Sequence, residues 1–130
     1  MYSKTSHDVR IIVVPSYLPD QSRPDANHYV WAYHVRIENR RSGPVRLRRR
    51  YWHITDALGQ VTEVEGPGVV GQEPLLQPGE HFEYTSGTPL KTPSGIMKGY
   101  YSMDGEAGER LEIEIPAFSL DSPHERPTLN

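Results

Sequence analysis

The chain of 130 residues contains no cysteine. This absence excludes disulfide bonds, thiolate zinc sites, thiol nucleophiles and redox motifs. The first ten residues contain no apolar core of a secretory signal, and no stretch approaches the ~18 apolar residues of a membrane-spanning helix. We therefore expect a protein without a membrane span and with a cytoplasmic location.

The sequence also lacks a strong charge of either sign. Lysine and arginine number 14 and the acidic residues 17, which gives a formal net charge of -3. Such a balance creates no global field that would attract nucleic acid or an anionic membrane. We expect no nucleic-acid partner, and any anion site must be local.

Recognisable catalytic motifs are missing as well. The chain has no G-x-S-x-G elbow, and neither Ser86 nor Ser94 has a recognisable partner base. It has no HExxH pattern and no acidic calcium loop. The sequence predicts a protein that is not an enzyme and carries no cofactor.

Helical periodicity and internal repeats are absent, whereas proline (12) and glycine (11) are frequent. They recur about every eight to fifteen residues, a spacing typical of short strands separated by turns. The segment 28–39 alternates most clearly, with one face formed by Tyr29, Trp31, Tyr33, Val35 and Ile37. Seven strands are predicted, at 9–14, 28–39, 45–55, 60–65, 80–86, 96–103 and 109–115.

This pattern predicts a single all-β domain over 1–130, an immunoglobulin or fibronectin type III-like β-sandwich of about seven antiparallel strands. We expect Pro15 to close the first strand and Pro116 to end the last one, with Phe118 and Leu120 covering one end of the core. Residues 19–27 should form a loop, and 121–130 a loose tail.

A glycine-rich segment at 66–71 formally matches the G-x-G-x-x-G pattern of dinucleotide-binding loops through Gly66, Gly68 and Gly71. That pattern requires a helix directly after it, and two prolines follow shortly here, so the dinucleotide-binding interpretation fails. Two alternatives remain: a strand connection that needs glycine for positive φ, or a small anion nest of backbone N–H groups. Val69 and Val70 are expected to pack under it.

An arginine-rich strand is the second candidate. Two-residue spacing predicts Arg46, Arg48 and Arg50 on one face, where three guanidinium groups could bind phosphates or an acidic protein surface. Alternatively, Arg50 lays its stem on Trp52, or the arginines form a solvated face that discourages edge pairing. In the anion hypothesis, Arg50 adds charge to the glycine loop.

Histidine occurs six times, but only His81 with Glu83 places two kinds of metal ligand on one strand face. Isolated histidines on polar strand faces are usually solvated. We therefore predict no metal site.

The motifs GVVG, PGE, YTSG and TPSG follow one another between residues 68 and 95, flanked by YVWAYHVRIENR, RYWHITDALG and EIPAFSLDSP. In these motifs and their spacing the chain resembles the ApaG family over nearly its whole length. The resemblance implies a fibronectin type III-like sandwich without catalytic residues. It also suggests the glycine loop as a pyrophosphate site. The basic character around Arg48 and Arg49 departs from the common family pattern.

Bacterial members of that family are associated with cobalt and magnesium tolerance and are often encoded beside a diadenosine tetraphosphate hydrolase. Related eukaryotic domains occur in an F-box protein and in a polymerase-delta-interacting protein. The resemblance therefore implies a non-enzymatic protein-interaction module linked to cobalt and magnesium homeostasis through a partner protein. A sensor of phosphate, pyrophosphate or a nucleotide is the alternative, and exposed strand edges leave a homodimer open.

Overall fold

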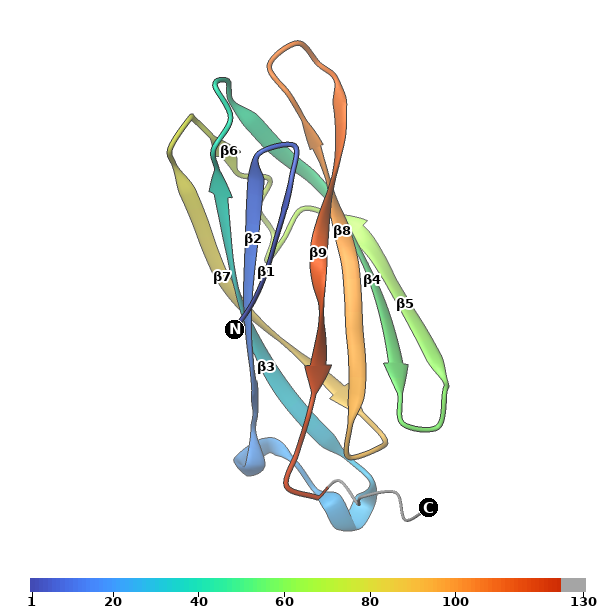
Figure 1. The fold of residues 1–130 in the computed structure, drawn as a ribbon. Coiled ribbons are helices and arrows are strands. Elements are labelled where there is room, and N and C mark those ends of the chain that lie inside the picture. The colour runs from blue at the N-terminus through green and yellow to red at the C-terminus, as the bar shows by residue number, and fades with distance from the viewer. Residues whose placement is uncertain (125–130) are drawn as a thin grey trace.

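The computed structural model describes residues 1–124 and consists of two antiparallel sheets packed face to face (Figure 1). The first sheet has the strand order β1 (Tyr2–Ser6), β2 (Val9–Tyr17), β3 (Tyr29–Asn39) and β7 (His81–Leu90). The second has the order β5 (Val61–Pro67), β4 (Val45–Asp56), β8 (Gly95–Asp104) and β9 (Arg110–Leu120), and β6 (Leu75–Leu76) also pairs with β4. The predicted all-β sandwich is confirmed.

The core lies between the inward faces of the two sheets. Strand β3 alternates buried and half-buried residues over its whole length, as its period of two predicts. Among the largest fully buried side chains are Trp31, Tyr101 and Phe118. The indole Nε1 of Trp31 donates to the carbonyl oxygen of Asp121 at 2.8 Å, which satisfies its one polar atom inside the core. Phe118 and Leu120 are buried, as expected.

All seven predicted strands are present, but the prediction missed β1 and β6. Strand β1 contains no buried residue, and β6 is two residues long, so neither shows a periodic apolar pattern. The predicted stops at Pro15 and Pro116 are wrong. Pairing of β1 with β2 ends at Val13, so Pro15 lies on a free edge, and Pro116 lies in an irregular stretch between Ile115 and Phe118; both places tolerate a residue without an N–H.

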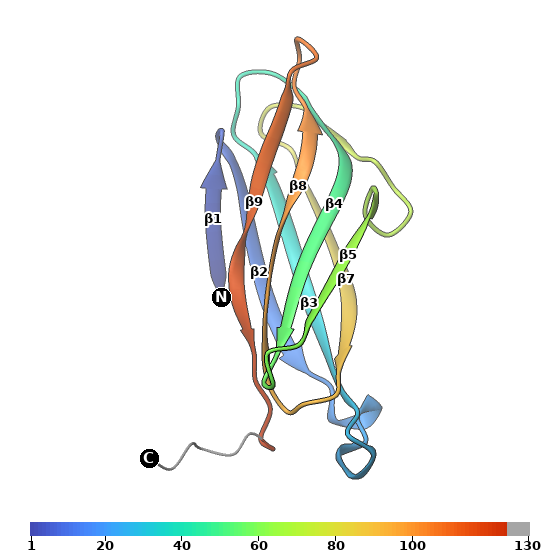
Figure 2. The ribbon, with the colours of Figure 1, turned by 90° about the vertical axis from the view of Figure 1, so that its right-hand side faces the viewer.

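One side of the sandwich is closed because β1 lies beside β9 (Figure 2). The N–H of Glu114 donates to the Ser6 hydroxyl at 3.2 Å, and the N–H of Ser119 donates to the Tyr2 hydroxyl at 3.4 Å. Lys4 forms an ion pair with Glu114. On the other side, the edge strands β5 and β7 do not pair with each other within residues 1–124, and the upper ends of the two strands lie apart in Figure 1.

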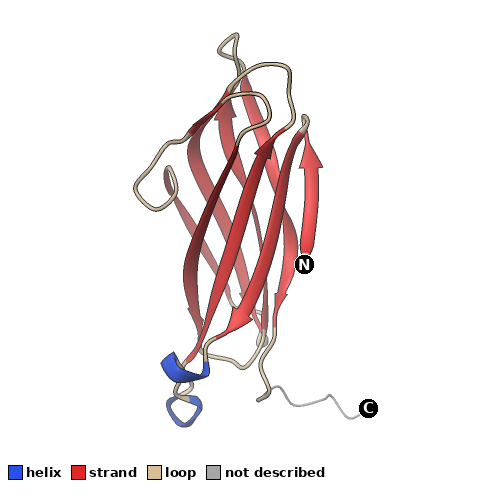
Figure 3. Ribbon diagram, turned by 90° about the vertical axis from the view of Figure 1, so that its left-hand side faces the viewer, coloured by secondary structure: helices blue, strands red, loops and turns tan. Residues whose placement is uncertain are grey.

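The connection between β2 and β3, expected as a loop, contains two short 3-10 helices, η1 (Pro19–Gln21) and η2 (Pro24–Ala26), at one end of the sandwich (Figure 3). Within residues 1–124, no helix is both long and apolar enough to cross a membrane. After β9, the Ser122 hydroxyl donates to the carbonyl of Pro93 at 2.6 Å. The remainder of the predicted tail, 125–130, lies outside the described residues.

Candidate functional site

The glycine-rich segment forms a tight two-residue turn after β5. The N–H groups of Val69 and Gln72 each donate to the other residue's carbonyl at 2.8 Å, and the central residues Val70 and Gly71 have φ values of 45° and 78°. Two positive φ values are typical of the hairpin turns that match strand twist. Val69 is buried as expected, but the prediction for Val70 is wrong, because it is 53% exposed. We call residues 66–72 the glycine hairpin.

Arg50 holds this hairpin against β4. Its Nη1 donates to the carbonyl oxygens of Pro67 at 2.9 Å and Gly68 at 3.0 Å. Gly66 is paired opposite Arg50, and a Cβ there would lie only 3.2 Å from that same nitrogen. At Gly68, where φ is +61°, a Cβ would collide with the carbonyl oxygen of Gln72. Both glycines therefore allow close packing of the backbone.

The predicted arginine ladder is wrong. A register shift between Leu47 and Arg49 reverses which residues of β4 face the core. Before the shift Leu47 is buried and Arg46 exposed, whereas after it Arg50 lies on the same face as buried Trp52. Arg48 contacts Asp104 at 3.0 Å and Glu73 at 3.3 Å in exposed ion pairs. Of the three, Arg50 alone reaches the glycine hairpin with side-chain hydrogen bonds within residues 1–124, whereas Arg48 accepts one from Gly68 N–H through its backbone carbonyl.

The hairpin covers a cavity of about 220 Å³ at the open side of the sandwich, which we call the inter-sheet cavity. Its lining contains Arg50 together with hydroxyl-bearing and apolar side chains from both sheets and the hairpin: Tyr33, Trp52, Val69, Val70, Gly71, Tyr84 and Ser86.

The tyrosines of this region remain neutral phenols at physiological pH. Burial raises the pKa of Tyr33 and, more strongly, those of Tyr84 and Tyr101, and the charge of Arg50 offsets only part of this effect. The Tyr84 and Tyr101 hydroxyls are hydrogen-bonded to each other. These groups can donate hydrogen bonds, but their raised pKa values keep them protonated, so no phenolate is available to act as a general base.

The inter-sheet cavity thus presents a guanidinium group and phenolic donors next to the hairpin. The N–H groups of Val70 and Gly71 donate to no atom within residues 1–124. Carbonyl oxygens of the hairpin already occupy Nη1 of Arg50, however, so the side chain also has a structural role. The structure brings the predicted residues Arg50, Gly66, Gly68 and Gly71 together.

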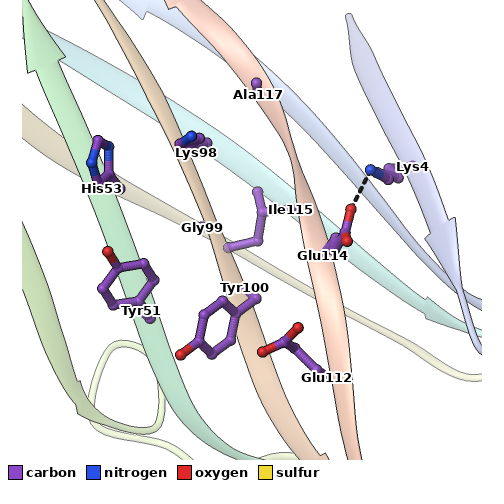
Figure 4. A pocket seen from close by; sticks show the side chains of 10 residues that line it. All are labelled: Lys4, Tyr51, His53, Lys98, Gly99, Tyr100, Glu112, Glu114, Ile115 and Ala117. Atoms are coloured by element: carbon purple, nitrogen blue, oxygen red, sulfur yellow. Dashed lines mark ion pairs between the residues drawn. The ribbon is translucent and has the colours of Figure 1, made fainter.

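A second hollow, of about 470 Å³, lies on the outer face of β4, β8 and β9 and is shown in Figure 4. We call it the outer groove. Aromatic, basic, acidic and small or aliphatic residues line it: Lys4, Tyr51, His53, Lys98, Gly99, Tyr100, Glu112, Glu114, Ile115 and Ala117. None of these residues was predicted to form a site.

Tyr51 and Tyr100 form its aromatic wall. Their rings stack with centroids 5.0 Å apart and an interplanar angle of 29°. The Tyr51 hydroxyl donates to Glu63 at 2.7 Å, and this carboxylate raises the pKa of Tyr51. A Cβ at Gly99 would collide with the Tyr51 carbonyl oxygen, so glycine is needed where β8 passes β4. The two tyrosines meet through strand pairing, which sequence spacing cannot show.

His81 and Glu83 lie on the outer face of the first sheet, where His34 joins them. The Glu83 carboxylate lies 3.0 Å from His34 Nε2 and 3.5 Å from His81 Nε2. The hydrogen bond from His34 lowers the pKa of Glu83. Arg36 also contacts this carboxylate, at 3.4 Å, and a guanidinium in that position opposes a bound cation. Over residues 1–124, no three potential ligands are arranged to hold a metal ion.

Comparisons with known proteins identify close relatives. The family model described as the ApaG domain matches residues 19–105. The proteins named ApaG from Paramagnetospirillum magneticum and Rhizobium meliloti are 62% and 55% identical over 130 residues, which is 100% of each chain. A crystal structure of a protein named ApaA from Bordetella pertussis has 51% identity and a TM-score of 0.87, over 91% of this chain and 96% of that one.

Proposed function

The chain belongs to the ApaG domain family, as its resemblance indicated, and we propose that it is a non-enzymatic protein-interaction module that binds its partner through the outer groove. The stacked Tyr51–Tyr100 pair carries this proposal. It is a half-buried aromatic pair on an outer sheet face, outside the core, and tyrosine is enriched at protein interfaces. Lys98 and Glu112 add charged groups at the rim.

Site-specific photo-crosslinking tests this function. With p-benzoylphenylalanine at Tyr100, we expect a stoichiometric covalent complex with one partner protein in the cells of origin. The same residue at Thr85, exposed on the outer face of the first sheet, is the matched control and should give none. Equal labelling at both positions, or a substrate turned over by the purified protein, would contradict the proposal.

The link to cobalt and magnesium tolerance would then act through the partner. In a strain lacking this protein, the wild-type chain should restore growth on cobalt. A Tyr51→Ala/Tyr100→Ala variant should not, although it keeps the core intact because both rings lie on the outer face. Full rescue by this variant would separate metal tolerance from the outer groove.

Anion binding at the glycine hairpin is the second candidate function. The inward position of Arg50 beside the unused N–H groups of Val70 and Gly71 favours it. Titration of pyrophosphate, ATP or diadenosine tetraphosphate into ¹⁵N-labelled protein should shift these two amides, and Arg50→Gln should reduce the effect while Arg46→Gln should not. Unshifted amides at millimolar ligand would refute it.

A further inference from the structure

Strand β5 leaves one long edge of the second sheet open. Its backbone pairs with β4 and with no other strand in the described part of the chain. Every side chain from 61 to 65 is exposed, including Val61 at 52% and Val64 at 38%. An exposed edge of this kind is a template for pairing with another extended chain.

Hydrogen bonds at both ends of the β4–β5 hairpin define which backbone groups are free. Asp56 N–H donates to the Gln60 carbonyl at 2.9 Å, and Gly68 N–H donates to the Arg48 carbonyl at 2.8 Å. Between them, residues of an antiparallel pair alternate between bonding to the partner strand and pointing away from it. The groups that point away from β4 belong to Val61, Glu63 and Glu65.

The two faces of this edge differ in chemistry. Glu63 and Glu65 are paired opposite His53 and Tyr51 and lie with them on the outer face. β5 itself contains no basic residue, and Arg49 contacts Glu65 at 3.4 Å from β4. Towards the first sheet, Thr62 borders a further cavity of about 330 Å³, which Ile54 and Leu90 also line. The edge is therefore acidic on one face and partly apolar on the other.

We propose that a partner protein contributes an extended segment that adds to β5 as a new strand, with basic residues alternating with aliphatic ones. The inference rests on the proposed interaction function and specifies the segment recognised. Added strands gain affinity from main-chain hydrogen bonds and specificity from alternate side chains. Here the basic side chains meet Glu63 and Glu65, and the aliphatic ones cover Val64 and the cavity beside Thr62.

Charge argues against a second copy of this chain as the occupant. Antiparallel pairing of two β5 strands would bring the carboxylates of Glu63 and Glu65 together across the new interface, and like charges in facing positions are destabilising. The other open edge, β7, is less suited to the same addition. It contains a single acidic residue, Glu83, which His34 and Arg36 already contact, so it offers an added basic strand less negative charge than Glu63 and Glu65 do.

The test uses the full chain and the peptide acetyl-TRVRVRT-amide, with acetyl-TRRRVVT-amide as a control of equal composition and charge. We expect the alternating peptide to bind, to slow hydrogen exchange at the free N–H groups of Val61, Glu63 and Glu65, and to bind more weakly as salt is raised. The acidic peptide acetyl-TEVEVET-amide should not bind.

Variants separate backbone pairing from charge. Glu63→Ala keeps the free N–H and should weaken binding about two- to fivefold. Glu63→Pro also removes that donor without breaking a bond to β4, and should weaken binding about tenfold or more. On β7, Asn39 N–H donates to the Glu80 carbonyl, so alternation along the strand leaves the Thr85 N–H pointing away from β3. Thr85→Pro removes this donor and is the matched control, with binding unchanged. Thermal unfolding of each variant verifies its fold.

Three results would overturn the inference. These are equal binding of the two basic peptides, unchanged exchange at β5 in the wild-type protein, and a concentration-dependent dimer that Glu63→Pro abolishes. The hydrogen-exchange measurement uses the wild-type protein, so its result does not depend on whether a variant folds. If crosslinking at Tyr100 still captures a partner while β5 exchange is unchanged, the interaction function stands and strand addition fails.

Discussion

Removing single hydroxyl groups from the buried Tyr84–Tyr101 pair should have unequal effects on stability. Tyr101 has no exposed surface, and its hydroxyl has the Tyr84 hydroxyl as its hydrogen-bond partner. Tyr84→Phe therefore leaves a fully buried donor unsatisfied, which costs about 1–3 kcal/mol. Tyr101→Phe instead leaves the Tyr84 hydroxyl without its partner, and Tyr84 is 8% exposed and lines the inter-sheet cavity. The smaller cost there, about 0.5–1.5 kcal/mol, follows because solvent can reach it.

The double variant tests this reasoning most sharply. With both hydroxyls removed, no buried hydroxyl is left without a partner, and replacing both partners of a hydrogen bond is close to neutral. We therefore expect the double variant to be more stable than Tyr84→Phe alone. Urea unfolding followed by tryptophan fluorescence gives the four free energies of the cycle, and a 2 kcal/mol loss corresponds to about 6–10 °C in Tm. Additive costs would refute the proposed pairing of the two hydroxyls.

Three further changes test the glycine hairpin and the charged face of the first sheet. Gly68→Ala should lower stability by more than about 1 kcal/mol, because φ is +61° and the new Cβ meets the Gln72 carbonyl oxygen. An unchanged Tm in this variant would show that the hairpin rearranges freely. Val70→Gly should leave stability unchanged or raise it by up to about 1 kcal/mol, because a β-branched residue is strained at φ 45°; a clear loss in thermal unfolding would contradict this. Hydrogen bonding from Arg36 lowers the pKa of Glu38 below 4.5 in the folded state, so its contribution is present above that pH and is lost as pH falls through the lowered value. Glu38→Gln should flatten the acid limb of a Tm-against-pH curve, and a curve parallel to the wild type would count against the ion pair.

The sequence was sufficient to predict the strands that bury one face. Tyr29, Trp31 and Ile37 alternate because β3 lies at the centre of the first sheet, and that burial imposes the period. Strand β1 could not be found in this way. Its five residues bury nothing, and it is defined by pairing with β2, which leaves no trace in hydrophobicity.

The candidate sites were less accessible to prediction, for two reasons. Arg50 was placed correctly on the face of Trp52 but wrongly on the face of Arg46, because the irregularity between Leu47 and Arg49 shifts the alternation by one residue and no local motif indicates it. The outer groove depends on Tyr51 and Tyr100 being neighbours, and they lie far apart in the sequence. The glycine pattern did indicate the turn, since positive φ at Gly68 and Gly71 is a local requirement.

The closed side of the sandwich has a consequence for how the chain folds on the ribosome. Its two fastening hydrogen bonds join residues 108 and 117 positions apart, Ser6 to Glu114 and Tyr2 to Ser119. The β1–β2 hairpin can form as soon as it emerges, but it must wait for β9, the last strand made, before its outer strand gains this cover. The first strand synthesised is thus among the last to be secured, and a nascent chain that stalls before residue 110 carries β1 as an unprotected edge.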